Sequence, residues 1–202
     1  MDYAKDKTKN IKHDFKLKNA IFPFSSLTLI CFAVIYALVV YDVLAIPNLL
    51  SFDNPIESII ISGVASVALL LFGVILTLTI PEDYIDDTNK TYQNDRLPDV
   101  FIFMFVAVLF EETLFRGIIQ NLLLIFTGHQ WVAILLTALL FIAFHIQYFQ
   151  KPIMLLNICI PSLVFGWIYF KTNNILVPIF VHFILNFGIT ILFKYELISF
   201  KR

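Results

Sequence analysis

Six long apolar stretches dominate the 202-residue sequence and limit what it can fold into. A helix needs about 20 mostly apolar residues to cross the hydrocarbon core of a bilayer. The stretches that reach or approach this length are Ala20–Ile46, Ser58–Ile80, Asp99–Phe126, Gln130–Phe149, Pro152–Phe170 and Asn174–Phe193. Prolines lie at the breaks between most of them. We therefore expect an all-α integral membrane protein, a bundle of about six transmembrane helices.

The composition agrees with a membrane protein and argues against a water-soluble domain. Hydrophobic residues make up 59% of the chain and charged residues only 14%, whereas soluble domains carry about 25% charged residues. Cys31 and Cys159 both lie in apolar runs without CxxC spacing, so we interpret them as buried small hydrophobes. No nucleotide-binding glycine pattern is visible, and we expect the lipid bilayer and no nucleic acid as a partner. The oligomeric state stays open.

Lysine and arginine residues outside the apolar stretches indicate an orientation. If the N-terminus is cytoplasmic, only Lys171 faces the opposite side, and twelve basic residues face the cytoplasm. These twelve are Lys5, Lys7, Lys9, Lys12, Lys16, Lys18, Lys90, Arg96, Lys151, Lys194, Lys201 and Arg202. The positive-inside rule then places both termini in the cytoplasm, which requires an even number of spans. The first stretch is too long for a signal peptide and lacks a small-residue cleavage site, so we interpret it as a membrane anchor.

Three charged residues lie near the middle of the third stretch. A charge at mid-bilayer costs about 2.5–3.5 kcal/mol, so Glu111, Glu112 and Arg116 must face protein or water. Glu112 and Arg116 are spaced i, i+4 and can pair on one helix face. Glu111 lies about 100° around the axis without that partner, free to act as a general base. A purely structural role explains these residues poorly, because polar contacts between membrane helices are worth only ~0.6–2 kcal/mol.

Two histidines and an asparagine extend the polar set. His145 lies late in the fourth stretch, and His182 lies in the sixth with Asn186 at i+4 on the same face. Glu111 and His182 are each twelve residues from the cytoplasmic end of their span, about 18 Å at 1.5 Å per residue. We expect these groups to line a cavity that is open to the cytoplasm. His13 and His129 are assigned no role.

This set of residue types suits the hydrolysis of a carbonyl compound by water. A glutamate and a histidine can polarise the water, and a second histidine with an asparagine amide can stabilise the oxyanion. No serine or cysteine lies beside an evident base, and HExxH is absent. Glu111, His145 and His182 could instead bind a divalent metal such as zinc, and the residue types alone do not separate the two hypotheses.

Three short motifs carry a family resemblance. Residues 111–116 (EETLFR) resemble the EExxxR motif of the CAAX protease and bacteriocin-processing family, called CPBP or Abi, of intramembrane endopeptidases. Residues 141–145 (FIAFH) resemble its FxxxH motif, and residues 182–186 (HFILN) resemble its HxxxN motif. The motifs occur in the family's order on three separate expected spans. The resemblance covers about residues 99–193.

The resemblance implies a role for each residue. Glu111 activates water with the help of His145, Glu112 and Arg116 position the substrate or hold the site together, and His182 and Asn186 stabilise the oxyanion. These six are the expected catalytic residues. No cofactor is expected under the metal-free view, which we favour over a metalloprotease.

The expected organisation of the chain follows from these assignments. A basic cytoplasmic tail (1–19) precedes two spans and an acidic cytoplasmic loop (20–98), in which residues 82–98 are interpreted as a solvated linker. A CPBP-like catalytic core (99–193) and a cytoplasmic C-terminus (194–202) follow. The richness in Ile, Phe, Lys and Asn is typical of a low-GC bacterium, so we expect the cytoplasmic membrane of a bacterium.

The expected function is an endopeptidase that cleaves a hydrophobic or membrane-bound peptide. The resemblance connects such bacterial proteins with bacteriocin immunity and peptide maturation. Two alternatives remain: a non-catalytic membrane protein that gives immunity by binding a bacteriocin, and a proton-coupled transporter, since buried acids and histidines also build proton relays.

Overall fold

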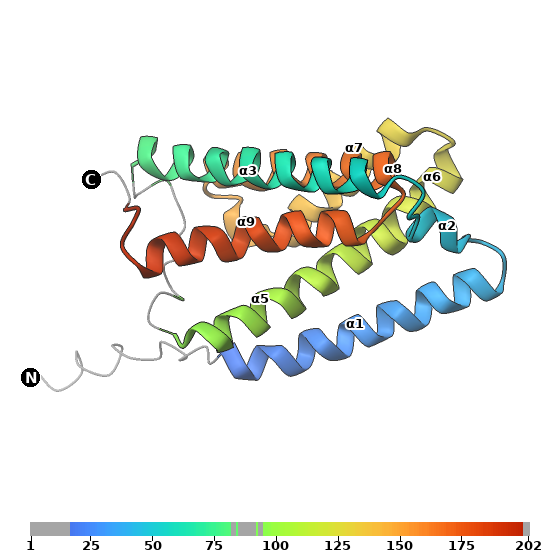
Figure 1. The fold of residues 1–202 in the computed structure, drawn as a ribbon, viewed down its shortest axis with the longest axis horizontal. Helices are drawn as coiled ribbons and strands as arrows, with labels where there is room; N and C mark the ends of the chain where they lie inside the picture. The colour runs from blue at the N-terminus through green and yellow to red at the C-terminus, as the bar shows by residue number, and fades with distance from the viewer. Residues whose placement is uncertain (1–16, 82–83, 85–91, 93–94, 200–202) are drawn as a thin grey trace, which may run out of the picture.

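The computed structural model describes residues 17–81, 84, 92 and 95–199, and these residues are almost entirely helical (Figure 1). Most of the expected basic tail, most of the acidic loop and the last three residues lie outside the described part. The elements are α1 (Leu17–Val40), α2 (Ile46–Leu49), α3 (Pro55–Thr79), α5 (Leu97–Glu112), the π-helix η2 (Thr113–Gln120), α6 (Asn121–Thr127), α7 (Gln130–Phe144), the 3-10 helix η3 (Ile146–Tyr148), α8 (Pro152–Thr172) and α9 (Leu176–Lys194).

The helices confirm the expected all-α membrane bundle. In the described part of the chain, four helices are long and apolar enough to cross a bilayer: α1, α3, α8 and α9. The third expected span is one continuous helical rod formed by α5, η2 and α6. The fourth, α7, is apolar but only 15 residues long. The protein is therefore a multi-pass membrane protein.

Two helices end earlier than the apolar stretches indicate. α1 ends at Val40 rather than Ile46 because Asp42 adopts a left-handed conformation with φ 57°, which breaks the helical hydrogen bonding. α7 ends at Phe144 rather than Phe149 because the His145 ring takes over the Phe141 carbonyl through Nδ1 at 2.8 Å. Single side chains, rather than the lengths of the apolar runs, determine these ends.

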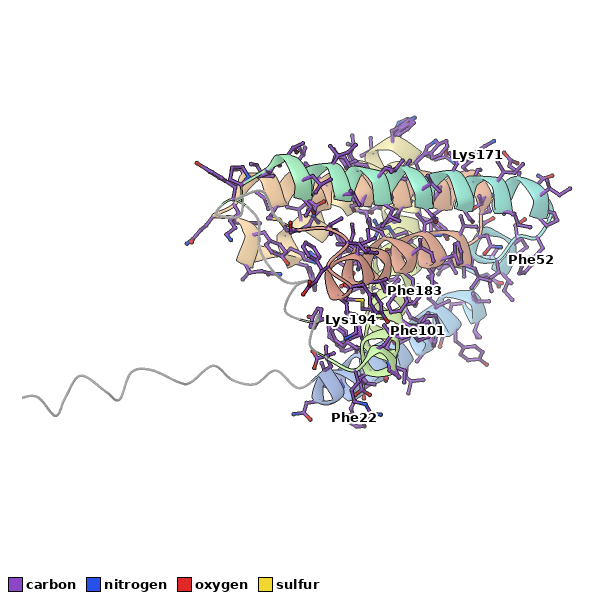
Figure 2. All side chains as sticks on the ribbon, turned by 60° about the vertical axis from the view of Figure 1, so that its left-hand side comes forward. Phe22, Phe52, Phe101, Lys171, Phe183 and Lys194 are labelled. Atoms are coloured by element: carbon purple, nitrogen blue, oxygen red, sulfur yellow. The ribbon has the colours of Figure 1, made fainter. Side chains whose placement is uncertain are left out.

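The long helices pack in neighbouring pairs. α1 lies against α5, α3 lies against α9, and α7 lies against α8 (Figure 1). One apolar core joins α3, α8 and α9, and a second joins α1 to the first half of α5. Phe101 on α5 and Phe183 on α9 meet edge to face with ring centroids 5.1 Å apart (Figure 2). The α5 part of the rod is thereby held between α1 and α9.

The outer surface of the bundle is apolar. Phe22 on α1 is 77% exposed and Ile56 on α3 is 73% exposed, and Figure 2 shows Phe22 and Phe52 at the periphery. Such an extended apolar surface is rare on soluble monomers and suits contact with lipid tails.

Polar contacts hold the two ends of the bundle. At one end, Lys171 forms an ion pair with Glu57 at 2.9 Å, joining α8 to α3. At the other end, the Lys194 ammonium donates to the carbonyl of Asp95 at 2.7 Å. The beginning of α1, the end of α3, the beginning of α5 and the end of α9 share this second end (Figure 1).

Candidate active site

The acidic pair lies where the rod changes from α-helix to π-helix. Glu111 and Glu112 are the last residues of α5, and Arg116 lies in the first half of η2. A π-helix has wider turns than an α-helix, and short π segments often occur at functional sites. The six expected site residues come from three parts of the bundle: this junction, the end of α7, and α9.

The expected ion pair between Glu112 and Arg116 is present and fully buried. The Arg116 Nη1 atom lies 3.3 Å from Glu112 Oε1, and both side chains are 0% exposed. The same Glu112 oxygen accepts a hydrogen bond from His182 Nδ1 at 2.7 Å. Glu112 therefore links the rod to α9 as well as to Arg116.

Arg116 is held further by α8. Its Nη2 atom donates to the backbone carbonyl and to the hydroxyl of Ser162, each at 2.9 Å. The guanidinium lies over the rings of Phe141 and Phe165, 5.1 and 5.5 Å from their centroids. Contacts of this kind compensate for burying a cation. Ser162 was not among the expected residues, although a serine inside an apolar span is a visible signal.

Glu111 lies on a different side of the helix and faces open space. Its side chain is 22% exposed, and its Oε2 atom lies 3.7 Å from His182 Nε2. His182 and His145 both interact electrostatically with this carboxylate. The spacing predicted that Arg116 pairs with Glu112 and not with Glu111, and the structure shows this arrangement. The structure also places His182 beside Glu111. His182 thus lies between the two glutamates.

The hydrogen bonds of the two histidines determine which ring nitrogen is available. The Phe141 carbonyl can only accept, so the His145 Nδ1 atom carries the proton and donates to it at 2.8 Å. A neutral His145 therefore has its lone pair on Nε2. The His182 Nδ1 atom likewise donates to the Glu112 carboxylate, which turns its Nε2 atom toward Glu111.

A cavity of about 260 Å³ brings four of the six residues together. Glu111, His145, His182 and Asn186 line it, whereas Glu112 and Arg116 lie behind its wall. Its other walls come from α1, α3, α5, α7, η3, α8 and α9, and from Tyr92 in the connection between α3 and α5. They are Phe24, Gly73, Thr77, Tyr92, Phe103, Met104, Ala107, Val108, Phe141, Tyr148, Met154, Asn157, Ile158, Pro161, Phe165, Leu185, Ile189 and Phe193.

Asn186 shares the cavity-facing side of α9 with His182, as its spacing predicts. Its side-chain amide makes no hydrogen bond with the residues that the structure describes, so both of its polar atoms are available to a ligand.

Tyrosine hydroxyls add polar groups to the cavity lining. Burial, with smaller contributions from Tyr148 and Asp95, raises the pKa of Tyr92 to about 12. Tyr92 therefore stays neutral at ordinary pH and acts as a hydrogen-bonding group rather than as a charge. Neither Tyr92 nor Tyr148 was expected at the site: Tyr92 lies between two apolar stretches, and Tyr148 lies at the end of the fourth, outside the three motifs.

Glu111, His145 and His182, which the sequence offered as possible metal ligands, are not arranged as a metal site. Within the described part of the chain, no three His, Cys, Asp or Glu side chains are grouped so that they could hold a metal ion. The geometry suits a water molecule held by Glu111 and the histidines.

Comparison with known proteins gives a family match for one segment of the chain. Residues 93–188 match the family described as type II CAAX prenyl endopeptidase Rce1-like. The matched segment contains all six expected site residues and all three motifs. This part of the chain is therefore similar to the CAAX protease family that the motifs resemble.

Two curated relatives are themselves uncharacterized. The chain is 25% identical over 124 residues to protein YpbD of Bacillus subtilis (strain 168), covering 60% of this chain and 61% of YpbD. It is 30% identical over 127 residues to a 24.3 kDa protein of Escherichia coli, covering 59% of this chain and 57% of the relative. The chain thus covers less than two thirds of either relative. No solved structure matches the chain.

Proposed function

We propose that this protein is an intramembrane endopeptidase that hydrolyses a peptide bond in a hydrophobic or membrane-bound peptide. One observation carries the proposal: Glu111, His145, His182 and Asn186 line a single cavity inside a bundle of apolar helices. The family match over residues 93–188 supports peptide hydrolysis as the reaction class.

Glu111 is the proposed base that activates water. Its carboxylate takes a proton from a water molecule in the cavity, and the oxygen of that water bonds to the scissile carbonyl carbon. His145 Nε2 accepts the water's second hydrogen as a hydrogen bond, because its Nδ1 proton is committed to the Phe141 carbonyl. The two side chains together orient the attacking oxygen.

His182 and Asn186 are the proposed oxyanion site. As the carbonyl π bond breaks, negative charge develops on its oxygen, and a doubly protonated His182 can donate to it from Nε2 while Nδ1 donates to Glu112. The Asn186 amide donates as well. When the tetrahedral intermediate collapses, the C–N bond breaks, and the proton held by Glu111 passes to the leaving amine.

Glu112 and Arg116 are proposed as positioning residues. Neither lines the cavity, and the Glu112 carboxylate instead fixes the orientation of the His182 ring at 2.7 Å. Arg116 holds that carboxylate in place and is itself held by Ser162.

The cavity is proposed to open on the cytoplasmic side of a bacterial membrane. Its lining includes Phe24, Thr77 and Phe193, which lie near the end of the bundle shared by the beginning of α1 and the end of α9. The distribution of basic residues in the sequence supports a cytoplasmic location for that end. A hydrophobic peptide in the inner leaflet, from a bacteriocin or a peptide undergoing maturation, is the proposed substrate.

Replacement of Glu111 by glutamine tests the proposal without knowledge of the substrate. Membranes from cells that produce wild type, Glu111→Gln, His145→Ala or Glu57→Gln are compared for new peptide termini by mass spectrometry. Glu57 pairs with Lys171 at the opposite end of the bundle, so Glu57→Gln is the matched control. We expect termini that appear with wild type and Glu57→Gln and disappear, by at least about 100-fold, with Glu111→Gln and His145→Ala.

The same four proteins, purified, are then tested on a quenched prenylated CAAX peptide and on its unprenylated form. Cleavage by purified Glu111→Gln at the wild-type rate contradicts the role of Glu111. Bacteriocin protection that survives Glu111→Ala, with no altered termini, favours the non-catalytic immunity hypothesis.

A further inference from the structure

Asn157 on α8 is a polar residue of the cavity that the proposed reaction does not use. It lies on the same cavity wall as Met154, Ile158 and Pro161 and is half-buried. Its side-chain amide makes no hydrogen bond with the residues that the structure describes. A polar amide in an apolar helix is unfavourable without a partner, so an amide directed at a cavity indicates a ligand that can supply one.

Pro161 leaves a second group of Asn157 in need of a partner. In an α-helix, the carbonyl of residue 157 accepts a hydrogen bond from the N–H of residue 161, but proline has no N–H. The proline ring also pushes that carbonyl away from the helix axis. Asn157 therefore offers a backbone acceptor as well as the donor and acceptor of its side chain.

Other polar groups along this helix have partners in the protein. The hydroxyl and carbonyl of Ser162 both bind Arg116, and the carbonyl of Gly166 accepts a hydrogen bond from Gln120 at 3.0 Å. Asn157 differs from them because it lines the cavity and its side chain has no hydrogen-bond partner among the described residues.

The cavity around Asn157 suits an extended, uncharged peptide. A peptide in extended conformation presents N–H and C=O groups that pair with such a donor and acceptors, and main-chain hydrogen bonds of this kind give affinity in strand-like recognition. Phe103, Leu185 and Ile189 offer apolar contacts to its side chains. The described lining contains no lysine or arginine that would select an acidic group.

We propose that Asn157 is a substrate-binding residue that holds the backbone of an extended apolar peptide, through its side-chain amide and through the carbonyl that Pro161 frees. This inference rests on the proposed function, because it assigns the peptide to the cavity that contains Glu111. Asn157 lies outside the three motifs of the sequence and fixes the peptide's position rather than reacting with it.

A binding assay in the Glu111→Gln background separates this inference from the proposed function. The probe is a dansyl-labelled, end-capped hexapeptide of alternating leucine and alanine, and the protein is held in lipid nanodiscs. We expect saturable binding, weakened about tenfold by Asn157→Ala. Leu156→Ala is the control, because Leu156 is 49% exposed on the outside of the same turn, and it should leave affinity unchanged.

Pro161→Ala separates a role of the Asn157 carbonyl in binding from a purely structural role, because we expect stability and probe affinity to change in opposite directions. Alanine supplies the missing N–H and restores the helical hydrogen bond, so the melting temperature should rise. The same bond occupies the Asn157 carbonyl, so probe affinity should fall about threefold or more. A probe with N-methylated backbone amides should bind Glu111→Gln protein weakly and lose little more on Asn157→Ala.

The outcomes separate clearly. Unchanged affinity in Asn157→Ala, unchanged affinity in Pro161→Ala, or no saturable binding to Glu111→Gln protein overturns the inference. If the probe binds through Asn157 while wild type cleaves no peptide, the binding site stands and the protease proposal fails. If wild type cleaves peptides while Asn157→Ala has the wild-type KM, the inference fails and the protease proposal stands.

Discussion

One oxygen atom of Glu112 serves two partners that approach from different helices. Oε1 contacts Arg116 and His182, whereas Oε2 is buried and has no hydrogen-bond partner among the described atoms. The Glu112 carboxylate is thus the shared group of a buried network, and each partner's position depends on it. Energetic coupling within such a network exceeds that of a surface pair, since water does not screen it.

The coupling between Glu112 and Arg116 should be visible in a double-mutant cycle. Glu112→Gln or Arg116→Met alone leaves one buried charge without its ion-pair partner, and each should lower the free energy of unfolding by about 3–5 kcal/mol. The double variant removes both charges, so it should lose clearly less than the sum of the two. The free energy of unfolding is measured in detergent for wild type, the two single variants and the double variant. Additive losses would argue against the buried pair.

The local part of the site could be predicted from the sequence, and the long-range part could not. The spacing of Glu112 and Arg116 fixed their pairing because both lie on one helix. The contact of His182 with Glu112 joins residues 70 positions apart, and that of Ser162 with Arg116 joins residues 46 positions apart. These depend on how the helices pack, which one sequence does not reveal. The motif resemblance recovered His182 but not Ser162 or Asn157.

At the scale of elements, α1 packs against the π-helix η2 as well as against α5. Gly117 lies in η2, and a Cβ atom there would come within 2.9 Å of Ile35 Cδ1 on α1 and 3.1 Å of Ile175 Cδ1. The absence of a side chain at Gly117 therefore lets α1 pack against the segment that carries Arg116.

Two glycine substitutions should have opposite effects on stability. Gly117→Val places two methyl groups where Ile35 and Ile175 already lie, and should destabilise the protein by about 1–3 kcal/mol. A Cβ atom added at Gly63 on α3 would have nothing within 4 Å, so Gly63→Ala should stabilise the protein by roughly 0.5–1 kcal/mol. Melting temperatures in one detergent compare the two variants directly. Equal shifts would contradict the close approach of α1.

Helix number and order followed from the apolar stretches, because only helices satisfy backbone hydrogen bonds in lipid. The π segment and the early end of α7 did not follow. Apolar periodicity does not register a change from i+4 to i+5 bonding, and the end of α7 depends on the hydrogen bond of one ring, that of His145.

At the scale of the molecule, the arrangement of the ends makes the orientation testable. The beginning of α1 and the end of α9 lie at the same end of the bundle, and Gly128 lies at the turn between α6 and α7. Green fluorescent protein fused after Arg202 should fluoresce, because it folds in the cytoplasm. Alkaline phosphatase fused after Gly128 should be active, because it requires the oxidising outer side. The reverse pattern would invert the proposed orientation of the cavity.

The cavity walls have a consequence for how such a protein can diversify. Phe24, Gly73 and Thr77 belong to α1 and α3, outside the residues that match the family, whereas the proposed reacting groups all lie within them. Under the proposed function, mutations in the first 80 residues can therefore reshape the cavity without changing the proposed reacting groups. Recombination in the connection between α3 and α5 could then combine the proposed reacting groups with a different cavity wall, and so with different peptides, in a single event.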